Sequence, residues 1–229
     1  MQSQLHRYAT DPREGDCLRL LPYVSPGRAL FFGNALAILP FLLAKHFDSV
    51  VTAEPDERRI GLALRRQQVE DVSNMVCMTA SSPEEVAGRH GLFDLVVLGD
   101  DDPDAPVSLP LADAAMAGRL ASVSAGGGCL MYGVRGRRWW PRARYPAQRR
   151  LLERVGFRVV QGYARQPGRR PYQLYLPLDD SRVLDYWLRN GRRPEGLRSR
   201  VTRLVKQAAI RLGTVSALFE NFVVIASRE

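Results

Sequence analysis

The sequence predicts an α/β protein built on a mostly parallel sheet that helices cover on both faces. Short apolar runs alternate with segments of helical periodicity, which is the pattern of repeated βαβ units. Five such units fall within residues 28–132, a spacing typical of nucleotide-binding folds. The 229 residues, 45% hydrophobic and 25% charged, are enough for one sizeable core and exclude a disordered or fibrous chain.

The first five predicted strands are short apolar runs, each ended by a turn or a polar residue. They comprise residues 28–32, 49–53, 75–78, 93–98 and 128–132. The helices predicted between them carry apolar residues three or four positions apart and span 36–47, 56–70, 83–87 and 112–121. Pro40 falls near the first turn of its helix, where proline is tolerated. A helix between consecutive strands is the connection that parallel pairing requires.

Beyond residue 135 the pattern changes to a basic, aromatic loop over 135–144, followed by less regular elements. Helices are predicted over 146–155, 183–188 and 196–218, and strands over 157–163, 172–178 and 219–226. The last strand is too apolar to stay in solvent, so we expect it to return to the sheet edge. The chain then divides into an N-terminal segment 1–26, an α/β core 27–178, and a C-terminal helical cap with the final strand 179–229, within a single domain.

The net charge of +9 hides two unlike halves. Residues 1–118 hold 10 Lys+Arg and 17 Asp+Glu, a net −7, whereas residues 119–229 hold 23 and 7, a net +16. Of the 33 basic residues, 31 are Arg. Coding bias explains the excess of Arg over Lys, but it does not explain why the arginines cluster. The second half is therefore predicted to face an anionic partner, or to balance the acidic surface of the first.

Cysteine usage and apolar runs indicate a cytoplasmic protein. The three cysteines lie far apart without a CxxC pair, which argues against a disulfide framework or a structural zinc site. The first ten residues lack the apolar core of a secretion signal. The most apolar stretch, 29–44, is shorter than the roughly 20 residues of a membrane helix.

Several short motifs occur in a characteristic order along the chain. A glycine turn at Gly33 follows the first strand, Glu54 closes the second, FDLVVLGD forms the fourth, and AGGGCLMYG forms the fifth. By this order and spacing, residues 27–178 and the closing strand resemble the class I S-adenosylmethionine-dependent methyltransferases. The resemblance implies a Rossmann-like methyltransferase fold, a mostly parallel seven-stranded sheet with a reversed last strand, and S-adenosylmethionine as cofactor.

The turn after the first strand departs from the family pattern. Members usually carry an acidic residue two positions before the first glycine of G-x-G-x-G, whereas this chain has Phe31 there and alanine at two of the glycine positions. A phenyl ring cannot bind the ammonium group of the cofactor. This departure favours an alternative, a catalytically lapsed domain that binds a partner or serves as a scaffold.

The resemblance assigns the cofactor site residue by residue. Gly33, Asn34 and Ala35 would cradle the methionyl part, Glu54 would hold the ribose, and Ser81 would approach the adenine. The alternatives stay open: an ordinary strand-to-helix turn for the first three, an acid at a helix N-terminus for Glu54, and a simple helix start beside Ser81, with Ser82 as the N-cap.

The catalytic and acceptor residues would lie after strands four and five. Asp100 would face cofactor and acceptor and, with Asp101, orient or deprotonate the acceptor, although a solvated acidic loop is the alternative and no metal is expected. The acceptor's negative group would meet a basic, aromatic set whose alternative is a solvated loop. That set is Arg135, Arg137, Arg138, Trp139 and Trp140.

The predicted function is methyl transfer from S-adenosylmethionine to an oxygen or nitrogen of a small, peptidic, or glycan- or lipid-linked anionic acceptor in a biosynthetic pathway. A second alternative beside the lapsed domain is an RNA-binding methyltransferase, although the position of the charge after strand five favours a small acceptor over nucleic acid. The cationic, amphipathic segment 196–218 could cap the site, pack as a surface helix, or contact a membrane peripherally.

Overall fold

A computed structural model describes residues 17–21, 24–99, 114–135, 144–166, 174–190, 204, 208–209, 219 and 221–228 of the chain. The strands run as β1 Arg28–Phe32, β2 Ser49–Glu54, β3 Met75–Thr79, β4 Phe93–Leu98, β5 Ser124–Arg135, β6 Val159–Gln166, β7 Leu174–Pro177 and β8 Asn221–Ser227. The helices run as α2 Leu39–Leu43, α3 Glu57–Val69, α4 Pro83–His90, α5 Ala114–Val123, α6 Tyr145–Arg154 and α7 Ser181–Asn190. Helices and strands thus alternate through β5, as the sequence pattern predicts.

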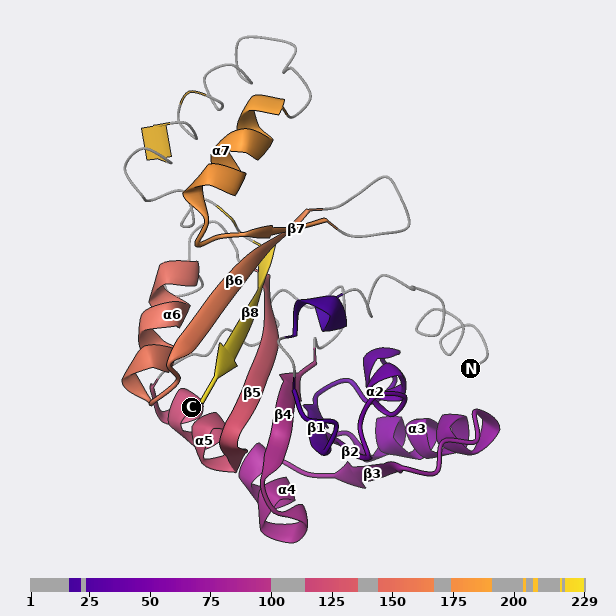
Figure 1. Cartoon of the computed structure of the whole chain (residues 1–229). Helices are drawn as coiled ribbons and strands as arrows, with labels where there is room; N and C mark the ends of the chain where they lie inside the picture. The colour runs from indigo at the N-terminus through magenta and orange to yellow at the C-terminus, as the bar shows by residue number, and fades with distance from the viewer. Residues whose placement is uncertain are drawn as a thin grey trace.

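The strands form one sheet in the order β3-β2-β1-β4-β5-β8-β6-β7 (Figure 1). The first five pair in parallel, and β8 runs antiparallel to both β5 and β6. The predicted reversed last strand is therefore confirmed. The sheet nevertheless has eight strands rather than seven, because β7 adds an antiparallel edge strand beside β6.

The closing strand lies inside the sheet and not at its edge, which corrects the sequence-based expectation. Tyr132 pairs with Val224 on one side, and Gly162 pairs with Val224 on the other. Five consecutive residues of β8, from Phe222 to Ala226, are buried. A strand covered on both faces and paired on both edges needs an almost continuous apolar run, which FVVIA supplies.

Helices cover the two faces of the sheet in separate layers (Figure 1). Buried side chains of α4, α5 and α6 share one core with alternate strand residues, among them Leu30, Val96 and Leu130. On the other face, α2 packs on a second core around Phe31 and Leu95, and α3 packs on a smaller cluster beside it. Two layers of helix around a parallel sheet are the predicted fold class, so this prediction is confirmed.

The helix after β1 is much shorter than predicted. Only Leu39–Leu43 is α-helical, whereas the periodicity predicts a helix over 36–47. Pro40 stands at the beginning of α2 with no side-chain cap before it. The shortening leaves residues 33–38 as an irregular turn, and this turn lies beside the carboxyl end of β2.

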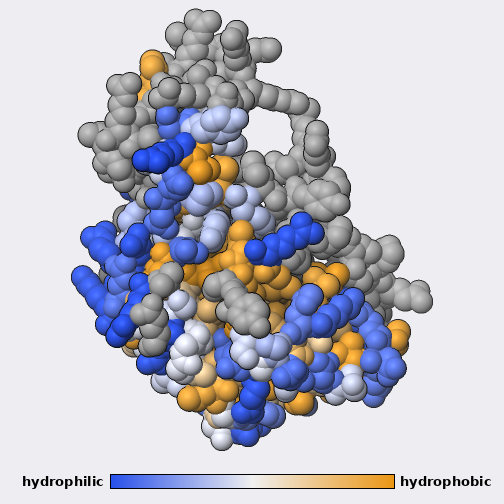
Figure 2. All heavy atoms as spheres, in the orientation of Figure 1, coloured by the Kyte–Doolittle hydropathy of each residue, from blue (hydrophilic) through white to orange (hydrophobic). Residues whose placement is uncertain are grey.

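Hydrophilic and hydrophobic side chains are separated on the surface of the molecule. On the face seen in Figure 2, hydrophilic side chains gather over α6 and over α3, and hydrophobic residues lie between them. Within the described part of the chain, no helix is long and apolar enough to cross a membrane.

Candidate functional site

Backbone hydrogen bonds continue past the strand ends and join four loops at the carboxyl edge of the sheet. The amide of Gly33 donates to the carbonyl of Ala53 at 2.9 Å. The amide of Gly99 donates to the carbonyl of Phe32 at 2.8 Å. The amide of Ala80 donates to the Glu54 carbonyl at 3.2 Å. The loops after β1, β2, β3 and β4 are thereby held side by side, where ligands bind in open α/β sheets.

Glu54 is the buried carboxylate of this edge. Its Oε2 accepts a hydrogen bond from the Ala35 amide at 2.8 Å, and its Oε1 pairs with Nη1 of Arg59 at the same distance. Only 3% of the Glu54 side chain is exposed, against 34% for Arg59. The structure thus brings two of the predicted cofactor residues, Glu54 and Ala35, into direct contact.

The surroundings of Glu54 act on its pKa in opposite directions. Burial raises the pKa of the carboxyl above its usual value of 4.5, and this is the largest effect. The hydrogen bond from Ala35 and the charge of Arg59 lower it in part. The net direction is upward, so Glu54 takes up a proton at a higher pH than an exposed glutamate.

The turn after β1 is held by several independent contacts. Gly33 has a φ of +136°, and a Cβ there would lie 2.8 Å from the Gly99 carbonyl oxygen. Asn34 is buried, and its Oδ1 accepts from the Leu36 amide at 3.1 Å. From α3, Arg66 donates to the Leu36 carbonyl at 3.0 Å. Glycine is therefore required at position 33 by both conformation and space.

Phe31, which replaces the acid of the family pattern, is buried in the core beneath this edge. A Cβ on Gly99 would lie 2.4 Å from Cζ of Phe31, so the ring packs directly under the loop that follows β4. The position that would carry a carboxylate is filled by hydrocarbon. Of the two acids that the family pattern has at these strand ends, this chain carries only Glu54.

Ser81 follows β3 and is exposed at the same edge. Its amide and hydroxyl both donate to Oε2 of Glu85, at 3.0 and 3.1 Å. The neighbouring Ser82 is the N-cap of α4 and accepts from the Glu85 amide at 3.3 Å. The capping alternative is confirmed for Ser82, and Asp56 likewise caps α3.

The remaining predicted site residues lie outside the described residues. These are Asp100, Asp101, Arg137, Arg138, Trp139 and Trp140. The backbone of Arg135 ends β5 next to Asn221 of β8, and its side chain is not described. Within the described ranges, no three His, Cys, Asp or Glu side chains come together as metal ligands.

Two arginines of α3 belong to the site, although the sequence analysis assigns no site role to any arginine of this helix. Arg59 pairs with Glu54, and Arg66 binds the turn while its guanidinium lies 4.0 Å from the centre of the Phe41 ring. A signal exists in the spacing. Because Asp56 fixes the start of α3, a residue in the first turn lies close to the strand end that precedes it.

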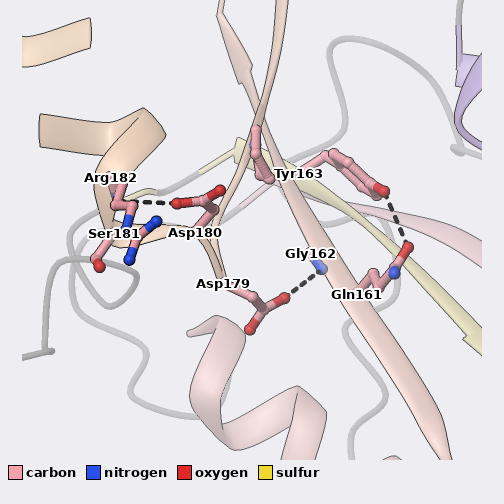
Figure 3. Close-up of a pocket in the computed structure, with 8 residues that line it drawn as sticks. Gln161, Gly162, Tyr163, Asp179, Asp180, Ser181 and Arg182 are labelled. Carbon is pink, nitrogen blue, oxygen red and sulfur yellow. Dashed lines mark hydrogen bonds between the residues drawn. The ribbon is translucent and has the colours of Figure 1, made fainter. Parts of the chain in front are cut away.

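A pocket of about 450 Å³ lies elsewhere, at the β6–β7 edge and the start of α7 (Figure 3). Beside it, Asp179 accepts from the Tyr145 hydroxyl at 2.5 Å and from Arg149 at 2.9 Å. Three strands, β4, β5 and β8, separate β6 from β1. This pocket is therefore distinct from the carboxyl-edge site around Glu54.

Solved structures share this fold at low sequence identity. A phosphoethanolamine N-methyltransferase 1 from Haemonchus contortus, in complex with phosphoethanolamine and S-adenosylhomocysteine, superimposes with a TM-score of 0.55 at 11% identity over 99% of this chain and 44% of its own. An O-methyltransferase from Bacillus cereus, in complex with S-adenosylhomocysteine, gives 0.55 at 13% over 99% and 86%. A spermidine synthase in complex with the transition-state analogue AdoDATO gives 0.50 at 13% over 99% and 59%.

These likenesses establish the fold as that of the class I S-adenosylmethionine-dependent methyltransferases. The chain spans less than two thirds of the Haemonchus methyltransferase and of the spermidine synthase. Neither a protein-family model nor a curated protein matches the sequence. Because the fold also serves a synthase, the choice of reaction depends on the residues of the site.

Proposed function

We propose that this chain binds S-adenosylmethionine at the carboxyl edge of β1 and β2 and transfers its methyl group to an oxygen or nitrogen of a small, peptidic, or glycan- or lipid-linked anionic acceptor. The observation that carries the proposal is the meeting of the Glu54 carboxylate with the Ala35 amide across the two strand ends. The shared fold of structures with bound S-adenosylhomocysteine supports it.

The chemistry of this edge fits the ribose of the donor. An ionised carboxylate accepts about four hydrogen bonds, and the structure assigns Glu54 one partner on each oxygen. Each oxygen therefore keeps a lone pair that a ribose hydroxyl could use once the carboxylate is uncovered. Phe31 offers nothing to an ammonium group, so Glu54 is the principal polar anchor that these two strand ends provide.

Each residue of the edge has a role in binding and alignment. Glu54 holds the ribose, the backbone of Gly33–Ala35 faces the methionyl part, and the hydroxyl of Ser81 lies towards the base. When bound, S-adenosylmethionine would supply a sulfonium methyl group for in-line transfer to the acceptor atom, with S-adenosylhomocysteine as the leaving group. Fixing the turn by Arg66 keeps its backbone preorganised, which limits the entropy lost on binding.

The acceptor side of the proposal rests on the sequence. Asp100 directly follows Gly99, whose amide is bonded to the end of β1, so its place in the chain is next to the donor site. Asp100 and Asp101 would orient the acceptor or remove its proton, and Arg135, Arg137, Arg138, Trp139 and Trp140 would hold its negative and flat groups.

Calorimetric titration with S-adenosylhomocysteine tests the donor part. We expect saturable binding of one ligand per chain, and competition by S-adenosylmethionine. Absence of heat and of competition up to millimolar concentration would show that the chain does not bind S-adenosylmethionine. Radiolabelled methyl transfer to acceptor mixtures fractionated by charge then tests the acceptor class.

A second candidate function, a lapsed methyltransferase-like domain that binds a protein partner, is favoured by one specific observation. The Glu54 carboxylate is already engaged by Arg59 and nearly inaccessible, and Phe31 removes the other acid. A thermal-shift screen separates the two functions. Stabilisation by a protein partner and by no adenosyl compound would select the lapsed domain.

A further inference from the structure

We infer that Arg59 is an intramolecular competitor of the donor ribose for Glu54, so that the ligand must displace this arginine in order to bind. The inference rests on the proposed function, because it concerns the same carboxylate. It adds a residue that sets the affinity for the donor and that a simple ribose-binding glutamate does not require.

Glu54 is closed to a ligand while both of its partners are in place. With 3% of its side chain exposed, Glu54 has no room for a ribose beside it in this conformation. Its two described partners are the Ala35 amide and the Arg59 guanidinium. One of them must withdraw before two ribose hydroxyls can reach the carboxylate.

The Ala35 amide is the harder partner to move. The turn that carries it is fixed by the Gly33–Ala53 hydrogen bond, by the Asn34 side chain on the Leu36 amide, and by Arg66. Arg66 is largely buried, with 10% of its side chain exposed. Withdrawal of Ala35 would therefore break several contacts at once, whereas withdrawal of Arg59 needs only the rotation of one side chain.

Arg59 can leave at a low cost. Its side chain is one-third exposed, so solvent screens its charge when the pair with Glu54 separates. A second carboxylate is close by, because Nε of Arg59 lies 3.7 Å from Oδ2 of Asp56 at the start of α3. Rotation towards Asp56 and solvent keeps the arginine near a negative charge and uncovers Glu54.

The consequence is an opposite effect on affinity and on stability. Without Arg59, the free protein keeps a buried carboxylate with one fewer partner, and its stability falls. The ribose hydroxyls no longer have to displace a cation, so affinity for the donor rises. If Arg59 merely positioned Glu54 for binding, its removal would lower both the affinity for the donor and the stability.

The test is calorimetric titration of the full chain with S-adenosylhomocysteine in wild type, Arg59→Ala and Arg58→Ala. Arg58 is the matched control, since it is the exposed neighbour in the same helical turn. We expect Arg59→Ala to bind about fivefold more tightly and to unfold at a lower temperature, with Arg58→Ala close to wild type. Arg59→Gln gives the same comparison if the alanine variant folds poorly.

The outcomes separate this inference from the proposed function. Binding by wild type together with unchanged or weaker binding by Arg59→Ala would overturn the competitor and leave the donor site intact. Binding by Arg59→Ala alone would support the competitor most strongly. Absence of binding by every variant, with folding verified by circular dichroism, would overturn the donor site and the competitor with it.

Discussion

Glu54 and Ala35 lie nineteen residues apart in sequence and share a hydrogen bond of 2.8 Å between the carboxylate Oε2 and the backbone amide. This bond joins the end of β2 to the turn after β1. It places the acid of β2 beside the backbone that follows β1, at the carboxyl edge where ligands bind in open α/β sheets.

Replacement of Glu54 by Gln removes the charge while keeping the shape of the side chain. We expect the affinity for S-adenosylhomocysteine to fall about 10–100-fold, because hydrogen bonds to a charged acceptor are lost. Calorimetry measures the change, and Glu57→Gln is the control, since Glu57 is exposed in the first turn of α3. Equal affinities for the three proteins would remove Glu54 from the ribose site.

The raised pKa of Glu54 predicts opposite pH dependences of binding and stability. Ribose binding uses the ionised carboxylate, so affinity falls as the pH drops through a pKa above 4.5. The folded state binds this proton more tightly than the unfolded state. The contribution of Glu54 to the free energy of unfolding is therefore full below pH 4.5 and is lost as the pH rises through the folded pKa.

Ligand titration and denaturant unfolding between pH 4 and pH 8 check this prediction. The quantities compared are the differences in affinity and in free energy of unfolding between wild type and Glu54→Gln. Both differences should change with pH above the ordinary glutamate value of 4.5. A change in either difference that is confined to pH 4.5 and below contradicts the burial argument.

Gly33→Ala should destabilise the fold by about 1–3 kcal/mol, because the new Cβ meets the Gly99 carbonyl at 2.8 Å and φ is +136°. Gly61→Ala is the matched control. Gly61 lies within α3, where an added Cβ meets nothing within 4 Å, so alanine should stabilise by about 0.5–1 kcal/mol. Denaturant unfolding measures both, and a Gly33→Ala protein as stable as wild type would refute the close approach of β1 and β4.

Tyr145→Phe should lower the free energy of unfolding by about 1.5–3 kcal/mol. The buried hydroxyl donates to the charged Asp179, and burial together with this bond raises the pKa of Tyr145 far above 10. Tyr163→Phe is the comparison, because the Tyr163 hydroxyl donates to the neutral side-chain oxygen Oε1 of the exposed Gln161. That change should stay within about 0.5 kcal/mol. Similar losses for both would argue against the Tyr145–Asp179 contact.

The sequence predicts the parallel half of the sheet well, since helical and strand periodicities alternate cleanly there. Helix 36–47 fails as a prediction because apolar spacing alone does not reveal that residues 33–38 are held in a turn by Asn34, Glu54 and Arg66. The place of β8 is also misjudged. An apolar run indicates burial, but not whether the strand lies at an edge or between two others.

For the site, spacing locates Gly33 and Glu54 because strand ends in a parallel sheet share one edge. The start of α3 at Asp56 brings its first turn close to the end of β2, but spacing does not show which side chain of that turn pairs with Glu54. The contact of Phe31 with Gly99 joins strand β1 to a loop that is distant in sequence. Such contacts follow from packing in three dimensions and leave no local pattern.

The most direct test of the central claim is a ¹H–¹⁵N correlation spectrum of the assigned protein titrated with S-adenosylhomocysteine. We expect saturable shifts of the Gly33, Ala35 and Glu54 amides, with amides of the β6–β7 edge unchanged. Absence of shifts at millimolar ligand, or saturable shifts confined to residues away from the carboxyl edge of β1 and β2, would contradict it.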